Sequence, residues 1–238
     1  TAALIRRIGH FTAEDFEGKV VWCEWSGRGP KRALLLNSVP LDMAEMLSSR
    51  LYPELRRCIL TSATLTVGGE FGYMISRLGL DRIERDRLMT RSFGSPFDYD
   101  RQALVLVPSF LASPKSPDFP GQVSLFMEEL LAVHSRGTLI LFTSHQMLRE
   151  VYRSLLPSLN KRGIRLLAQE ISGPRSSLLK VFQEEKDSVL LGTNSFWEGV
   201  DVPGEPLRGL VLQKLPFRVP TEPITAARME AVERRGGN

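Results

Sequence analysis

The chain has 238 residues, of which 42% are hydrophobic and 24% are charged, a composition that argues against a disordered chain. It has no apolar run close to the roughly 20 residues that a membrane-spanning helix needs, and its first residues lack the apolar segment of a signal peptide. We therefore expect a cytoplasmic globular protein with no membrane partner.

Charge and cysteine content restrict the partners only weakly. The net charge is +4, which is compatible with a polyanionic partner without requiring one. Cys23 and Cys58 lie in apolar runs, which predicts buried, inert thiols. Two cysteines cannot form a four-thiolate zinc or iron–sulfur site, and the three histidines lack metal-ligand spacing, so we expect no metal site.

The first 70 residues predict an incomplete domain. Residues 20–25 and 32–36 have the pattern of paired strands around a turn at 26–30, and they precede a short helix within 41–51 and a strand at 57–60. Such a segment is too small to bury its own apolar side chains. We therefore expect residues 1–70 to be the remainder of a neighbouring domain, and residues 71–238 to form a second domain.

From residue 103 onward, segments typical of strands and helices alternate. Strands are predicted at 103–107, 138–142, 164–168, 188–192 and 209–213, and helices at 121–135, 148–156, 175–186 and 222–235. This alternation predicts an α/β fold with a parallel sheet and helices on both faces.

Polar clusters follow two of the strand-like runs. Residues 61–65 (TSATL) place three hydroxyl side chains after the run at 57–60. Such hydroxyls can bond loop backbone and relay a change between domains, but the pattern on its own favours a solvated turn. Residues 142–146 (FTSHQ) lead from a strand into a helix, where exposed N–H groups attract phosphate. Ser144 or His145 could instead be a simple helix N-cap, and the two roles are compatible.

The most informative segment is the loop at 193–201 (TNSFWEGVD), which follows the apolar run at 188–192. Thr193 and Asn194 are short donors of the kind that hold a nucleic-acid backbone. Asp201 can accept a hydrogen bond from a ribose hydroxyl, and Gly199 allows a ligand to approach the backbone. The alternative is a connection in which Trp197 simply packs on the core.

Two nucleotide-binding motifs are absent. No G-x-x-x-x-G-K-[ST] phosphate loop occurs, and the glycine pair at Gly27 and Gly29 lies in a predicted hairpin turn with no helix after it.

Four segments in order resemble the C-terminal half of the DinG branch of the XPD-like, superfamily 2 DNA helicases. They are residues 61–65 (motif III), residues 141–144 (LFTS, motif IV), residues 192–201 (GTNSFWEGVD, motif V) and residues 214–217 (KLPF). The resemblance implies two RecA-like domains with ATP and Mg²⁺ between them and single-stranded or forked DNA across both. It also implies DNA repair as the setting.

The resemblance assigns roles to nine residues. Coupling of hydrolysis to domain movement is implied for Ser62 and Thr64, with Gln169 on the same surface. Contacts to the DNA backbone are implied for Ser144, Thr193 and Asn194, and contacts to the nucleotide for Glu198, Gly199 and Asp201, with Asp201 near the ribose.

The chain departs from the family pattern in lacking the phosphate loop, the acidic Mg²⁺ box and motif VI. We therefore expect a fragment that needs the missing N-terminal helicase domain, is inactive alone and binds no cofactor tightly. Two alternatives stay open. One is a non-catalytic module that binds nucleic acid or a protein partner. The other is an enzyme with a nucleotide cofactor on a Rossmann-like sheet, which would need a glycine-rich turn that residues 107–111 do not offer.

Overall fold

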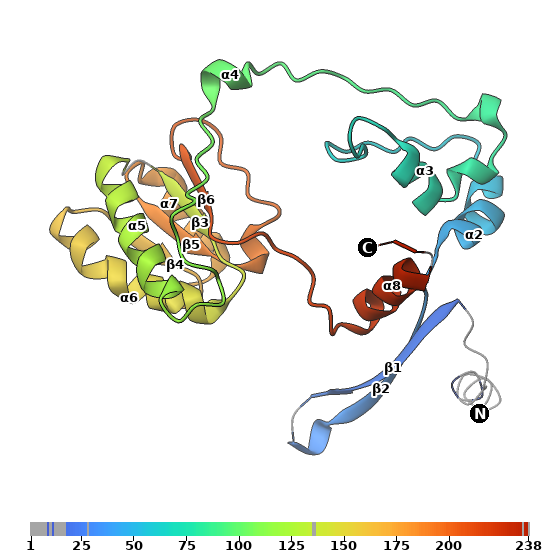
Figure 1. Ribbon diagram of the computed structural model, residues 1–238, viewed down its shortest axis with the longest axis horizontal. Helices are drawn as coiled ribbons and strands as arrows, with labels where there is room; N and C mark the ends of the chain where they lie inside the picture. The colour runs from blue at the N-terminus through green and yellow to red at the C-terminus, as the bar shows by residue number, and fades with distance from the viewer. Residues whose placement is uncertain are drawn as a thin grey trace. The chain divides into compact units, whose positions relative to one another are not determined.

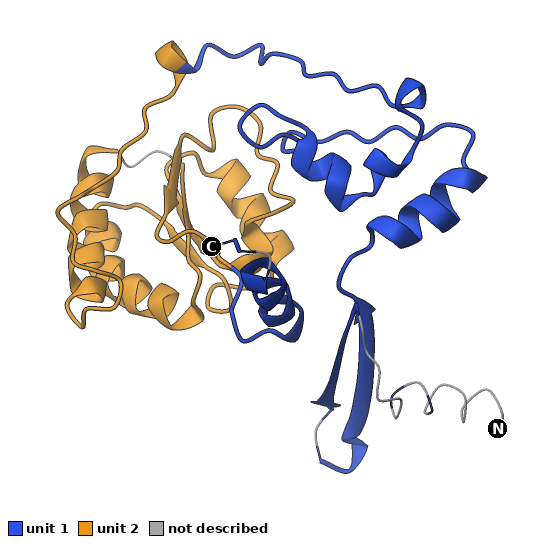
Figure 2. Cartoon of the chain, turned by 45° about the vertical axis from the view of Figure 1, so that its right-hand side comes forward, with its two compact units in different colours: residues 1–99, 218–238 blue, residues 100–217 orange. Residues whose placement is uncertain are grey.

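The computed structural model describes residues 9, 11, 18–27, 29–134, 137–234 and 236–237. The chain forms two compact units, shown in Figure 2. The sheet unit comprises residues 100–217, and the hairpin unit comprises residues 1–99 and 218–238. The predicted division of the chain into domains at residue 70 stays a prediction.

The sheet unit is built on four parallel strands in the order β4-β5-β3-β6, as Figure 1 shows. Their bounds are Thr138–Leu141 for β3, Leu166–Ala168 for β4, Val189–Gly192 for β5 and Gly209–Leu212 for β6. Every residue of β3, β4 and β5 is buried, as expected for strands covered on both faces.

Helices cover both faces of this sheet. On one face, side chains of α5 (Phe119–Val133) and α6 (His145–Lys161) form a core with Ile140 and Leu191. On the other face, Leu178 and Phe182 of α7 (Arg175–Glu184) pack against Leu139 and Leu190. The sequence-based prediction of an α/β parallel sheet with helices on both faces is therefore confirmed.

One predicted strand of the sheet unit is wrong. Residues 103–107 form no strand, and the side chains of residues 104–107 are 62–83% exposed. An apolar run becomes a strand only where a neighbouring backbone completes its hydrogen bonds, and the described sheet ends at β6, whose Leu210 and Leu212 are also exposed. The periodicity identified an apolar segment correctly, but it could not supply the partner strand.

This exposed run predicts self-association of the isolated chain. An exposed apolar segment of high β-propensity is a typical aggregation site, as is the unpaired edge of a strand such as β6. We expect Val105→Lys to lower light scattering and to shift the chain towards the monomer in size-exclusion chromatography at micromolar concentration. Val133→Lys, a change of another exposed valine at the end of α5, is the control. Equal scattering by wild type and Val105→Lys would contradict this prediction.

The hairpin unit begins with the predicted hairpin. The strands β1 (Lys19–Ser26) and β2 (Ala33–Pro40) pair antiparallel, with Ser26 opposite Ala33. The helix α8 (Pro223–Arg234), predicted at 222–235, contacts β1 and so belongs to this unit. The remaining helices are short: α2 (Ala44–Met46), extended by a wider helical turn at Leu47–Leu51, then α3 (Gly72–Arg77), and α4 (Tyr99–Gln102) at the boundary of the units.

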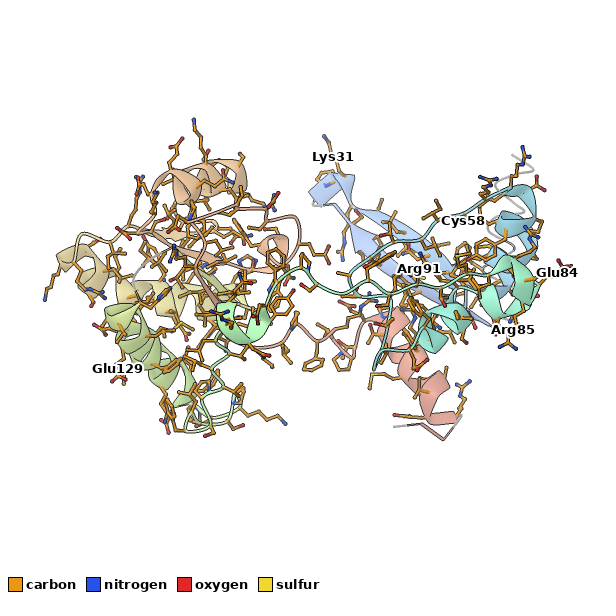
Figure 3. All side chains as sticks on the ribbon, turned by 90° about the horizontal axis from the view of Figure 1, so that it is seen from above. Lys31, Cys58, Glu84, Arg85, Arg91 and Glu129 are labelled. Atoms are coloured by element: carbon orange, nitrogen blue, oxygen red, sulfur yellow. The ribbon has the colours of Figure 1, made fainter. Side chains whose placement is uncertain are left out.

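Two further predictions for the first 70 residues are wrong. Residues 57–60 form no strand. Cys23 and Cys58 are both exposed instead of buried, and Figure 3 labels Cys58. The cause is the same as for residues 103–107. The run at 57–60 has no strand partner in the described part of the chain, and most side chains of the hairpin are only partly covered.

Tyr52 is a buried side chain of the hairpin unit with a hydrogen bond to a distant part of it. Its ring is buried, and its hydroxyl donates a hydrogen bond to the carbonyl oxygen of Leu78 at 2.9 Å. Burial, and then the nearby Cys58 thiol, raise the pKa of the Tyr52 hydroxyl above its ordinary value. The neutral phenol therefore stabilises the fold, and this contribution is lost as the pH rises through the raised pKa.

Among the described residues, no helix is both long and apolar enough to cross a membrane.

Candidate nucleic-acid and nucleotide interface

Three segments with candidate residues meet at the end of the sheet formed by the carboxyl ends of its strands, called the carboxyl edge below. In the parallel register, Leu141 of β3 lies opposite Gly192 of β5, and Ala168 of β4 lies opposite Leu191. The residues that follow these strands therefore leave the sheet side by side. This edge is where α/β folds place their ligands.

Gln169 and Thr193 are in direct contact at this edge. The backbone N–H and the hydroxyl of Thr193 both donate to Oε1 of Gln169, at 2.8 and 3.0 Å. The Thr193 side chain is only 2% exposed, and its oxygen also lies 3.3 Å from Nε2 of His145. Thr193 thus ties the loop to β4, and its hydroxyl already has a protein partner.

An ion-pair cluster that the sequence did not reveal extends this contact. His145 Nδ1 and Arg149 both lie 3.3 Å from Oε2 of Glu170. Glu170 has φ +65°, the one positive value for a non-glycine among the described residues. The spacing of His145 and Arg149, one helical turn apart, was the available signal. Ser144 is the helix N-cap, because its hydroxyl accepts a bond from the Met147 N–H at 3.3 Å.

The 193–201 loop alternates buried anchors with exposed polar groups. Phe196, the last residue of the short 3₁₀ turn Asn194–Phe196, has a buried ring. Trp197, which follows the turn, is half-buried on the same cluster. The Trp197 indole N–H donates to the carbonyl oxygen of Phe142 at 3.3 Å. Trp197 therefore has the core role that the sequence left open.

The polar residues of the loop are turned outward. Asn194 and Ser195 at its start, and Glu198, Gly199 and Asp201 at its end, are all exposed. One loop thus presents neutral hydrogen-bonding side chains at one end and two carboxylates at the other.

Two residues of α7 hold the backbone of this loop, and the sequence analysis missed both. Arg175 donates from Nε to the carbonyl oxygen of Ser195 at 3.0 Å, and from a terminal nitrogen to those of Glu198 and Gly199 at 3.2 and 2.9 Å. Gln183 donates to the carbonyl oxygen of Asp201 at 3.1 Å. No motif marks these residues, because they act on backbone atoms in a segment about 20 positions away.

The exposed carboxylates fit one part of a nucleotide better than another. Asp201 and Glu198 can accept hydrogen bonds from ribose hydroxyls, whereas a phosphate would be repelled by either. A Cβ at Gly199, where φ is +64°, would meet only a terminal nitrogen of Arg175, so the backbone is open to a ligand. The described residues hold no group of three or more His, Cys, Asp or Glu side chains that could bind a metal ion. These residues suit the sugar of a nucleotide.

Ser62 and Thr64 lie in the hairpin unit. Both are exposed, their hydroxyl oxygens are 3.2 Å apart, and the Thr64 N–H donates to Oγ of Ser62 at 3.2 Å. They form a local hydroxyl turn, and their coupling role stays a prediction.

The chain is similar to several named bacterial proteins. It is 38% identical over 233 residues to the 3′-5′ exonuclease DinG of Bacillus subtilis. The aligned region covers 96% of this chain and 24% of that protein. It is 33% identical to the ATP-dependent DNA helicases YoaA of Haemophilus influenzae and Escherichia coli, over 92% and 93% of this chain and 33% of each relative. The chain thus spans a quarter to a third of the length of these relatives.

A family model also matches the chain. Residues 127–238 fit the model described as the helicase C-terminal domain. The match includes β3 to β6, α6, α7 and the whole 193–201 loop. The resemblance stated from the sequence motifs is confirmed: residues 127–238 match the helicase C-terminal domain, and most of the chain is similar to relatives named DinG and YoaA.

Proposed function

We propose that this chain is the C-terminal part of an ATP-dependent DNA helicase, in which it contributes contacts to the backbone of single-stranded DNA and half of the ATP cleft. The observation that carries the proposal is the 193–201 loop, whose start exposes an amide and a hydroxyl and whose end exposes two carboxylates. Relatives named ATP-dependent DNA helicase share this part of the chain.

The DNA contact is assigned to side chains at the carboxyl edge of the sheet. Asn194 and Ser144 are exposed and can donate to phosphate oxygens, and Thr193 holds the loop between them against Gln169. Backbone contacts of this kind carry no sequence preference and weaken with salt.

The nucleotide contact is assigned to Glu198, Gly199 and Asp201. In the whole protein, bound ATP with Mg²⁺ supplies the free energy of hydrolysis. The residues of this chain would orient the ribose, while a preceding domain with a phosphate loop would hold the phosphates. The chain alone should therefore bind nucleotide weakly.

Two single variants of the whole protein separate these assignments. Asp201→Ala removes a charged acceptor, worth about 1.5–3 kcal/mol, and should lower ATP turnover by roughly 10- to 100-fold with DNA affinity nearly unchanged. Asn194→Ala removes a neutral donor and should lower single-strand affinity by roughly 2- to 10-fold, with a smaller effect on basal turnover. Fluorescence anisotropy across salt and a phosphate-release assay measure the two quantities.

Asp187→Ala is the matched control, since Asp187 is an exposed carboxylate at the opposite, amino end of β5. Loss of both functions to the same extent in both variants would refute the division of roles. Binding of single strands by a whole protein that hydrolyses no ATP would favour a non-catalytic binding module instead.

A further inference from the structure

Arg175 lies at the centre of the 193–201 loop, although it belongs to another element. It is the first residue of α7, and its guanidinium donates to three backbone carbonyl oxygens, those of Ser195, Glu198 and Gly199. The same group lies 5.4 Å from the centre of the Phe196 ring. One planar cation thus takes part in four interactions within a five-residue span.

These contacts join the two ends of the loop. The carbonyl of Ser195 directly follows Asn194, the exposed amide assigned to DNA, whereas Glu198 and Gly199 belong to the end assigned to the nucleotide. A shift of the Glu198–Gly199 backbone by less than 1 Å would break bonds of 2.9 and 3.2 Å or turn the guanidinium with them. The guanidinium is rigid and planar, so such a turn reaches the Ser195 carbonyl as well.

The helix that carries Arg175 is held firmly on the sheet. α7 packs on the sheet through Leu178 and Phe182, which are fully buried. Arg175 therefore transmits a displacement within the loop instead of following it freely.

We propose that Arg175 is a positioning residue that couples nucleotide occupancy at the end of the loop to the DNA contact at its start. This inference rests on the function proposed above and adds a residue to it. Coupling of this kind is reciprocal, so DNA should raise the affinity for nucleotide by the same factor by which nucleotide raises the affinity for DNA.

The chemistry of arginine separates this role from a simpler one. A lysine at position 175 keeps the positive charge, but its ammonium group cannot hold three carbonyls in the geometry of the guanidinium fork. If Arg175 served only as a positive charge near a DNA phosphate, Arg175→Lys would behave like the wild type. If it couples the two ends, Arg175→Lys and Arg175→Ala should fail alike.

The test measures ATP hydrolysis by the whole protein with and without saturating single-stranded oligonucleotide. We expect both Arg175 variants to lower the DNA-stimulated to basal ratio by about fivefold or more, a larger factor than any change in the basal rate or in the melting temperature. Lys180→Ala is the control, because Lys180 lies on the same helix, is 76% exposed and pairs with Glu184 one turn away. An unchanged ratio, or a parallel loss of all activities with the melting temperature, would overturn the proposal.

A second measurement on this chain keeps the proposal separate from the proposed function. With Trp22 and Trp25 replaced by Phe, Trp197 is the single tryptophan, and its quenching by acrylamide reports how tightly the loop is held. Arg175→Ala should raise the quenching constant, and Lys180→Ala should not. A wild-type protein without DNA-stimulated hydrolysis would refute the proposed function, whereas unchanged quenching in Arg175→Ala would refute the role of Arg175.

Discussion

Replacing Gly192 by alanine should destabilise the sheet unit by about 3 kcal/mol, at the upper end of the usual cost of overpacking. A Cβ at this position would lie 2.7 Å from Cβ and Cγ of Phe196 and 2.9 Å from Cδ2. The Phe196 ring is fully buried and packs against the sheet, so it cannot move aside without opening the core. Urea unfolding followed by circular dichroism measures the loss.

The origin of this effect can be tested with a double-mutant cycle. Phe196→Ala removes Cγ and Cδ2, so Gly192→Ala should cost less in that background than in the wild type. It should not become free, because the Cβ of residue 196 remains at 2.7 Å. Gly121→Ala, inside α5 with open space around it, is the control and should be neutral or stabilise by about 0.5–1 kcal/mol. Strict additivity of Gly192→Ala and Phe196→Ala would contradict the proposed contact.

The contact between Gly192 and Phe196 shows why sequence analysis located the 193–201 loop but not the contacts that hold it in place. An apolar run that ends in Thr193 and Asn194 identified a strand with a functional loop after it, since run length and side-chain polarity are local properties. That Gly192 is small because Phe196 folds back on it depends on the path of the loop. No local pattern of residue types shows that path.

The residues that hold the loop were beyond sequence analysis for a related reason. Arg175 and Gln183 bind carbonyl oxygens, which every residue has, so their targets leave no mark in the sequence. Glu170 in turn depends on a backbone with φ +65°, which its side-chain type does not suggest. Gln169 was found only because the resemblance pointed to that strand end.

The wrong predictions have one common cause. The runs at 57–60 and 103–107 have the composition of strands, and Cys23 and Cys58 the surroundings of buried thiols, yet all are exposed in the described structure. Composition reports how strongly a segment favours burial, whereas burial itself needs a partner surface. The strands predicted correctly in both units, β1 to β6, each pair with at least one other strand of the chain.

Replacing Trp197 by alanine should cost about 3 kcal/mol, because it removes a half-buried ring from the cluster with Leu139 and Phe196 and deprives the Phe142 carbonyl of its donor. Trp197→Phe keeps most of the ring packing and should lose only about 1 kcal/mol, the net value of the hydrogen bond.

The order wild type, Trp197→Phe, Trp197→Ala in urea midpoint, with salt-dependent single-strand affinity unchanged in the folded proteins, would establish the indole as part of the core. A Trp197→Ala variant with wild-type stability and weakened DNA binding would instead make the indole a surface on which a base stacks. We expect the first result, because the indole N–H already donates to the carbonyl oxygen of Phe142, the residue that follows β3. Trp197 then stabilises the fold of the 193–201 loop, which carries Asn194 and Asp201. Its role is to hold the loop on the core, and it does not contact the ligands.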